Sequence, residues 1–324
     1  MSCTSYLAYL PSIDWELSCG ITSIFICITA SIENIIILLT LSWYKNLHTS
    51  TNGLLASLAL SDLLVGLTLA PLHALQLLSP NLLNHCLVDE IRRYLSTLLI
   101  GASAFTIGGI SYDRYLHMSK LMNYRDYMSK KKVTGIIFFC WLIPALIPVI
   151  RYVFKSEKAY FSAIVIGVAL VLGTLLACYI LIIASMRYRG RWIHISRQFE
   201  ERQLRTLRTV IIILTTFILM ILPICLHHIV FIAFPTTDIH TKVKLYMVGQ
   251  TLAMLNSSAN PVIYYFRNPE FRANLRKILH LNFSQNNMDD RATAVTKTNS
   301  NASCSASSRL NGNQVELTSI TLYS

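Results

Sequence analysis

Long apolar segments constrain this chain more than any other feature of its sequence. A helix that crosses a membrane needs about 20 mainly apolar residues, because the hydrocarbon core is roughly 30 Å thick and a helix rises about 1.5 Å per residue. Seven segments meet that length, at residues 20–43, 53–78, 87–117, 133–151, 159–187, 206–234 and 242–265. We therefore predict an all-α membrane protein, a bundle of seven transmembrane helices.

The composition agrees with a membrane protein and argues against several other classes. Hydrophobic residues make up 53% of the 324 residues and charged residues 14%, against about 25% charged residues in a soluble domain. The net charge of +12 suggests nucleic acid, but much of it falls between the apolar segments, so we predict no nucleic-acid partner. No cysteines have the spacing of a metal site, and no nucleophile–base set is present, so we predict neither an enzyme nor an organic cofactor.

Lysine and arginine residues in the connecting segments predict the orientation of the chain. They gather on one side of the predicted bundle, which the positive-inside rule assigns to the cytoplasm. On that basis residues 1–19 form an extracellular N-terminal segment and residues 20–266 the transmembrane domain. Residues 267–280 form a short amphipathic helix, and the polar residues 281–324 form a disordered cytoplasmic tail.

Three motifs place ionisable or kink-forming residues in these segments. Asp62 lies in the middle of the second segment, too deep to reach water, so we interpret it as functional rather than as a tolerated interfacial residue. Asp113-Arg114-Tyr115 closes the third segment beside a basic loop. Asn260-Pro261-Val262-Ile263-Tyr264 lies in the seventh segment, where proline removes a backbone hydrogen bond and kinks the helix.

In their order along the chain, these motifs resemble those of the rhodopsin-like (class A) G-protein-coupled receptors. The resemblance covers roughly residues 20–280, and its motif residues are Asn34, Leu58 to Asp62, Asp113 to Tyr115, Trp141, Tyr179, Phe217, Pro223 and Asn260 to Tyr264. Arg267 to Arg272 resembles the family's amphipathic eighth helix. The resemblance implies a plasma-membrane receptor, with its N-terminus outside, that binds a ligand and activates a cytoplasmic heterotrimeric G protein.

The resemblance also implies roles for buried polar residues. A sodium ion would stabilise the inactive state in a pocket of Asp62, Ser103, Asn256, Ser257 and Asn260; a buried carboxylate needs a cation or a proton in any case. Arg114 would pair with Asp113 at rest and turn towards Tyr179 and Tyr264 on activation. The activation switch then comprises Asp113, Arg114, Tyr115, Tyr179, Phe217, Pro223, Pro261 and Tyr264.

The chain departs from the family pattern in both the helices and the outer loops. Ile221 stands where the sixth helix usually has a tryptophan, and Val171 stands where the fifth usually has a proline. Asp89 replaces the usual cysteine at the outer end of the third helix, and the second outer loop has no cysteine, so the common disulfide is absent. Cys86 either remains a free thiol or pairs with a cysteine of the N-terminal segment, Cys3 or Cys19.

These departures, with Glu33 before Asn34, are similar to the melanocortin receptors and to their wider relatives, the adenosine, cannabinoid and lysolipid receptors. The acidic cluster with which melanocortin receptors bind calcium and peptide is not reproduced. Leu72 and Arg93 occupy two of its three positions, and only Asp89 remains. The resemblance therefore implies a divergent member of this neighbourhood.

Polar residues at the outer ends of the segments are candidates for ligand binding. They are His73, Asp89, Arg92, Arg93, Ser96, His227 and His228. Ser96 stands where amine receptors have an aspartate, and Met254 where opsins have the retinal lysine, which argues against both ligands. The two arginines either bind a carboxylate or phosphate or reach lipid headgroups. Adjacent histidines face different directions on a helix, so we predict no metal pair there.

The composition of the C-terminal tail suggests partners in addition to the G protein. Its serine and threonine residues, within 293–308, suggest phosphorylation by a receptor kinase and capture by arrestin, although a plain solvated tail has the same composition. The ligand stays open between a small molecule, a lipid and a peptide. Two other functions also stay open: a receptor fold that no longer couples and acts as a decoy or partner subunit, and a seven-helix transporter with Asp62 as its proton relay.

Overall fold

The chain is described by a computed structural model in which residues 13–44, 47, 49–78, 86–119, 127–192, 197–267 and 272–275 are placed. The described residues form helices and no strands. The helices are α1 (Ile13–Trp43), α2 (Ser50–Leu64), η3 (Val65–Leu69), α3 (Ala70–Leu78), α5 (Cys86–Ser119), α7 (Lys130–Phe154), α8 (Glu157–Trp192), α9 (Arg197–Ala233) and α10 (Ile239–Arg267). Because α2, η3 and α3 follow one another without a break, they form one span, and the predicted all-α bundle of seven helices is confirmed.

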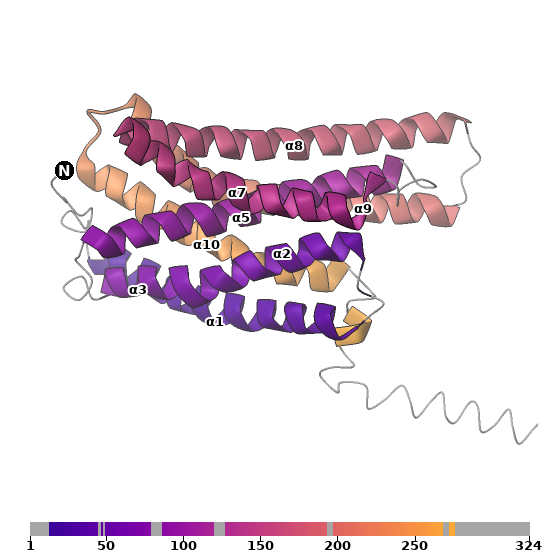
Figure 1. Ribbon diagram of the computed structural model, residues 1–324, viewed down its shortest axis with the longest axis horizontal. Coiled ribbons are helices and arrows are strands. Elements are labelled where there is room, and N and C mark those ends of the chain that lie inside the picture. The colour runs from indigo at the N-terminus through magenta and orange to yellow at the C-terminus, as the bar shows by residue number, and fades with distance from the viewer. Residues whose placement is uncertain are drawn as a thin grey trace, which may run out of the picture. The chain divides into compact units, whose positions relative to one another are not determined.

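The seven spans run alongside one another in the unit that comprises Met1–Phe271 (Figure 1). Helix α1 packs against α2, α3 and α10, while α5 packs against α2, α7 and α8. Helix α9 lies between α8 and α10. Residues 272–275, in a separate unit, are helical. The rest of the predicted eighth helix and the whole of the tail lie outside the described residues.

Six helices of the described chain are long and apolar enough to cross a membrane. They extend over Asp14–Trp43, Asn52–Leu78, Leu87–Ser119, Lys130–Phe154, Glu157–Arg187 and Ile211–Ala233. Helix α10, with 29 residues, is long enough but more polar. Its polar side chains include Gln250, Thr251, Asn256, Ser257 and Asn260, and all of these are buried. The low hydropathy of α10 therefore reflects a polar inner face, which the other helices cover.

Apolar side chains occupy both the inside and the outside of the bundle. Phe217, Ile107 and Leu175 are buried in one core cluster. By contrast Leu170 is 61% exposed on α8 and Leu219 is 63% exposed on α9. Large apolar groups on an outer surface of this extent need a non-aqueous environment. The bundle is therefore built to be surrounded by lipid.

Candidate functional site

A buried polar cluster surrounds Asp62 in the middle of the bundle. The Asp62 side chain is fully buried on α2, and the Asn260 amide of α10 donates a hydrogen bond of 2.7 Å to its Oδ2. The hydroxyls of Ser103 on α5 and Ser257 on α10 lie in its immediate surroundings. Asn34 on α1 donates to the backbone carbonyl of Ser257 at 3.2 Å. Side chains of four helices thus meet at this cluster.

The oxygens of this cluster suit a small cation. Asp62 Oδ1 and Ser103 Oγ are both buried and have no hydrogen-bond partner among the described residues. An unpaired buried carboxylate oxygen is costly unless a cation or a proton neutralises it. The cluster offers only oxygen ligands to such an ion, as hard cations prefer. The five residues of the predicted sodium pocket, including the buried Asn256, therefore fit an alkali ion.

The residues of the predicted switch lie on α5, α8, α9 and α10. Asp113, at the end of α5, is fully buried, and Arg114 and Tyr115 beside it are half-buried. Tyr179 is half-buried on α8. Pro261 is buried on α10, but the side chain of Tyr264 lies outside the described residues. The structure gives no contact between Arg114 and Asp113, so their pairing stays a prediction.

The sixth predicted span, α9, meets α10 at an unusually close approach. Pro223 lies inside α9, and a Cβ atom added to Gly249 of α10 would come within 2.6 Å of the Ile224 backbone nitrogen. Phe217 and Ile221, which precede Pro223 by six and two residues, are buried in the same core cluster as Ile107 and Ile110 of α5. Ile221 thus fills with an aliphatic side chain the place where the family usually has a tryptophan.

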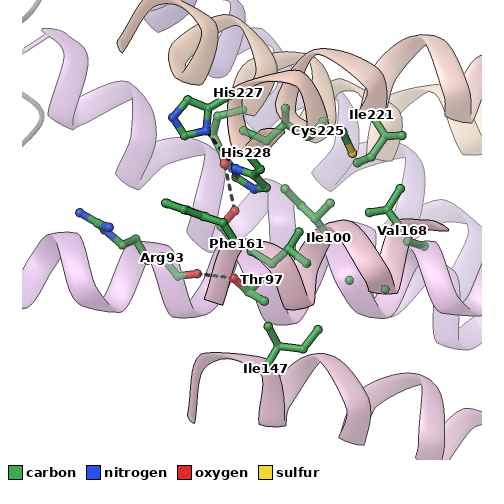
Figure 2. Close-up of a pocket in the computed structure, with 18 of the residues that line it drawn as sticks. Arg93, Thr97, Ile100, Ile147, Phe161, Val168, Ile221, Cys225, His227 and His228 are labelled. Atoms are coloured by element: carbon green, nitrogen blue, oxygen red, sulfur yellow. Dashed lines mark hydrogen bonds between the residues drawn. The ribbon is translucent and has the colours of Figure 1, made fainter. Parts of the chain in front are cut away.

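A pocket opens among α5, α7, α8, α9 and α10, in the half of the bundle that we predict to face outward. Its atom-free space is about 920 Å³ with the open mouth included. One end carries polar groups and the other is apolar: Arg93, Thr97 and the two histidines lie towards one end in Figure 2, and Ile221 and Val168 towards the other. Of the seven predicted ligand-binding residues, five line this pocket, namely Arg92, Arg93, Ser96, His227 and His228.

The other two predicted residues do not line the pocket. Asp89 is buried beneath the arginines: its Oδ1 accepts a hydrogen bond from Arg92, and its Oδ2 accepts one of 2.9 Å from Arg93. His73 is 2% exposed, and its Nε2 lies 3.5 Å from the Thr251 hydroxyl. Asp89 therefore positions the two arginines that line the pocket. His73, on α3, packs against α10.

The two histidines of α9 meet, contrary to what their adjacency suggests. We expected neighbouring residues to diverge, since they point about 100° apart around a helix. Instead His227 Nδ1 and His228 Nδ1 are 2.9 Å apart, because both side chains turn towards Phe161 of α8. The His228 ring stacks on Phe161 with centroids 4.7 Å apart, and His227 meets the same ring edge-on at 5.8 Å. The pair is part of an aromatic wall of the pocket.

Several polar residues of the pocket were not predicted from the sequence. Gln250 accepts a hydrogen bond of 3.0 Å from Ser96, and Tyr246 accepts one from Arg92. Tyr160 and Thr97 share a hydrogen bond of 2.5 Å across α8 and α5. Gln250 could have been predicted from the sequence, because an uncharged amide within a transmembrane segment rarely lacks a hydrogen-bond partner. Nothing in the sequence distinguishes Tyr160 and Tyr246, since tyrosines at the membrane interface are common in any membrane protein.

An ionic network joins the outer ends of three helices. Arg151 of α7 donates to Glu157 of α8 at 2.7 Å and to Glu90 of α5 at 2.7 Å. Arg93 of α5 lies 3.7 Å from Glu157. The usual disulfide that ties the third helix to the second outer loop is missing from this sequence. These ion pairs connect the same two parts of the bundle, α5 and the start of α8.

The sequence left open whether Cys86 pairs with Cys3 or Cys19, and the structure excludes Cys19. Cys19 is buried in α1 as a free thiol, so its pairing with Cys86 is not formed. Cys3 and the side chain of Cys86 lie outside the described residues. In the part of the chain that the structure describes, ion pairs, hydrogen bonds and packing hold this end of the bundle together.

We expect Arg151→Gln to weaken this outer end. The change removes hydrogen bonds to two carboxylates that are only partly exposed, which corresponds to about 1–2 kcal/mol. The apparent melting temperature of the purified protein should fall by on the order of 5 °C, as measured by thermal unfolding in detergent. Lys158→Gln, an exposed neighbour for which the described residues offer no ion pair, is the control. Equal melting temperatures for the two variants would contradict the structural role of Arg151.

Comparisons with known proteins agree with this architecture. A family described as "7 transmembrane receptor (rhodopsin family)" matches residues 33–162 and 155–264. Among individual proteins, the muscarinic acetylcholine receptor gar-2 of Caenorhabditis elegans is 33% identical over 126 residues. That alignment covers 38% of this chain and 20% of the relative. The chain therefore matches about a fifth of that receptor's length.

Proposed function

Because the chain belongs to the rhodopsin family of seven-transmembrane receptors, we propose that it is a plasma-membrane receptor that transmits binding of an outer ligand to a cytoplasmic heterotrimeric G protein. It is a membrane receptor and not an enzyme. The N-terminus is proposed to lie outside and the tail in the cytoplasm, in keeping with the basic connecting segments. Membrane lipids surround the exposed apolar faces of the bundle.

One observation supports this proposal most directly: α5 and α9 each contain residues that line the pocket and residues of the predicted activation switch. Helix α5 contributes Arg92, Ser96 and Phe105 to the pocket and carries Asp113-Arg114-Tyr115 in its last two turns. Helix α9 contributes Ile221 and His228 to the pocket and continues for more than five turns beyond it. A ligand that shifts α9 against α5 therefore acts on both ends of the molecule.

The proposed mechanism is a shift between two arrangements of α9. The resting arrangement buries Phe217 and Ile221 against α5. A ligand that favours an outward displacement of the cytoplasmic part of α9 opens a groove for the G protein, with Pro223 providing the kink. Arg114 then turns from Asp113 towards Tyr179 and Tyr264. Ile221 supplies the apolar contact that couples pocket and core, without the tryptophan usual in the family.

We further propose that a sodium ion stabilises the resting arrangement at Asp62. The two unpartnered buried oxygens, Asp62 Oδ1 and Ser103 Oγ, support this proposal. Because Asp62 belongs to α2, Ser103 to α5 and Asn260 to α10, these residues would hold a cation between three helices. A displacement of α10 during activation separates these groups and weakens the site.

Asp62→Asn should therefore abolish the effect of sodium. In the wild type, replacing potassium by sodium should lower basal nucleotide exchange on the G protein, by about tenfold for a coupling free energy within the usual range. Asp62→Asn removes the charge at nearly constant volume, so its exchange rate should be the same in both salts. Ser61→Ala is a matched control, because the Ser61 hydroxyl bonds only to the carbonyl of Leu58. A sodium effect that survives in Asp62→Asn would rule out this ion site.

The ligand of the relative does not transfer directly to this chain. The relative's name states that it is a receptor for acetylcholine, a cation. Residues that line the pocket in the described structure include no aspartate or glutamate but do include Arg92 and Arg93, whose positive charges would repel a cation. We therefore propose a non-cationic ligand. A divergent position near the melanocortin, adenosine, cannabinoid and lysolipid receptors, and partnership with a receptor kinase and arrestin through the tail, are proposed on the sequence alone.

The function is tested by nucleotide exchange on purified G proteins. The full chain, reconstituted in lipid nanodiscs, is combined with representative Gs, Gi, Gq and G12 heterotrimers, and GTP analogue uptake is measured with and without extracts of candidate ligands. Accelerated exchange on at least one heterotrimer is the expected result. Normal surface expression with no exchange on any of them would favour the second candidate, a non-coupling decoy or partner subunit, which Ile221 at the tryptophan position supports.

A further inference from the structure

Three buried donor or acceptor atoms in the polar end of the pocket have no partner among the described residues. They are Nε of Arg92, Nε2 of Gln250 and Nε2 of His227. Their residues are 3%, 2% and 1% exposed, and all three line the pocket. A buried polar atom without a hydrogen bond costs about 1–3 kcal/mol. Each of these atoms therefore gains free energy when a ligand supplies its partner.

The three groups lie around one aromatic ring. The guanidinium carbon of Arg92 is 5.1 Å from the centroid of the Tyr246 ring, and the His227 ring is 5.2 Å from the same ring on another side. Gln250 follows Tyr246 by one turn of α10 and holds Ser96 at 3.0 Å through its carbonyl oxygen. Since Ser96 follows Arg92 by one turn of α5, the free amide nitrogen of Gln250 and the Arg92 side chain belong to the same end of the pocket.

All three atoms can donate to one acceptor. Arg92 Nε and Gln250 Nε2 carry hydrogen and are donors only. His227 and His228 share one hydrogen bond between their Nδ1 atoms, so in the neutral pair one of the two rings carries its proton on Nε2. When His228 donates in that bond, His227 carries its proton on Nε2 and becomes the third donor. A ligand that accepts from Nε2 selects this tautomer.

The charges around the pocket suit a single negative charge. Arg92 and Arg93 line the pocket, whereas the carboxylates that pair with them, Asp89 and Glu157, do not. Arg151 and Glu90 complete the network, so that three arginines face three carboxylates. Because the network is balanced, a doubly charged phosphate would bring two uncompensated charges into a largely apolar cavity, whereas a monoanion brings only one. A monoanion held by charge-assisted hydrogen bonds is tolerated.

The remainder of the pocket is apolar. Beyond Ser96 and Thr97 the lining includes Phe105 and the aliphatic side chains of Ile100, Val168 and Ile221 (Figure 2). We propose that the ligand is an apolar monocarboxylic acid, whose carboxylate accepts hydrogen bonds from Arg92, Gln250 and His227 and whose body fills the apolar end. This proposal rests on the proposed receptor function and specifies the class of its ligand.

Binding of matched probes to the purified full chain tests the proposal. Decanoic acid, 1-decanol and decylamine share one apolar body and differ in the head group, and 4-phenylbutyric acid offers a carboxylate on an aromatic body. Ligand-induced thermal stabilisation in nanodiscs measures binding without a G protein. We expect at least one of the two acids to bind at least about tenfold more tightly than the alcohol and the amine.

Two variants locate the carboxylate. Gln250→Leu and Arg92→Gln should each reduce the affinity of the acid by about tenfold and leave the affinity of decanol unchanged. Arg92→Gln leaves Asp89 paired with Arg93, and Gln250→Leu alters no charge, so the second variant tests the proposal even where the first folds poorly. Thr174→Val, on the exposed face of α8 and outside the pocket lining, removes a hydroxyl that bonds to the Leu170 carbonyl; it is the control and should bind the acid as the wild type does.

The outcomes separate the ligand class from the function. Equal or tighter binding of the alcohol or the amine, or acid binding that neither variant weakens, overturns the ligand proposal. Acid binding with the expected variant effects, but without nucleotide exchange on any G protein, supports the ligand class and leaves the receptor as a binding protein that does not couple. Acid binding together with accelerated exchange supports both.

Discussion

Replacing Gly249 by alanine should greatly reduce the amount of folded protein. A Cβ atom at this position would lie 2.6 Å from the backbone nitrogen and 2.7 Å from the Cα atom of Ile224, and 2.9 Å from the carbonyl carbon of Pro223. All three atoms belong to the backbone of α9, so no side chain can move aside. Helices α9 and α10 must separate, which weakens the packing along their whole contact. We expect a loss of about 3 kcal/mol or more.

The measurement compares three glycines by expression and thermal unfolding. Gly173→Ala on α8 is the matched control, because a Cβ atom there has nothing within 4 Å. Alanine favours a helix over glycine by about 0.5–1 kcal/mol, so this control should be neutral or stabilising. Gly66→Ala is a second test, since the new Cβ atom would meet Ser31 Oγ at 2.7 Å. Wild-type stability of Gly249→Ala would show that the two helices are further apart than described.

Arg114→Ala should abolish activation of the G protein without loss of the receptor from the cell surface. Arg114 is half-buried at the end of α5, and the described residues give it no hydrogen bond or ion pair on which the packed bundle depends. Its removal therefore has a small effect on folding. In the proposed mechanism, however, its guanidinium is the group that turns towards Tyr179 and Tyr264 in the active arrangement, so the loss of exchange should exceed about a hundredfold.

Nucleotide exchange and surface labelling are measured together for this variant. Lys132→Ala changes an exposed residue at the start of α7, removes one positive charge from the side that we predict to be cytoplasmic, and is the control. It should retain most of the exchange activity. If Arg114→Ala signals normally at normal surface levels, the proposed switch is wrong, although the family membership and the pocket are unaffected.

Much of the fold follows directly from local patterns in the sequence. Each span is recognisable because its apolar length must match the thickness of the bilayer, which depends on no other segment. The depth of Asp62 within its segment likewise predicted a buried carboxylate, and the structure places it fully buried against Asn260. The sequence of α10 also indicates a buried polar face, because a transmembrane segment with many amides and hydroxyls must turn them towards the inside of the bundle.

The pocket could be predicted only in part. Five of seven predicted residues line it, since residues near the outer ends of inward faces converge there in any bundle of this kind. Whether His73 or Gln250 joins them depends on the rotation of α3 and α10 about their axes, which packing against other helices decides. The contact between His227 and His228 depends on Phe161 of α8, a residue more than sixty positions away.

The long apolar segments, which constrain the fold most strongly, therefore determined the seven-helix architecture, and the motifs within them determined the family. Only the tertiary structure decided how those helices meet: the backbone contact at Gly249, the ion pairs that replace a disulfide at Arg151, and the unpartnered donors of Arg92, Gln250 and His227. The physical reason is that lipid acts on each segment separately, whereas contacts between helices depend on how side chains from distant segments pack against one another.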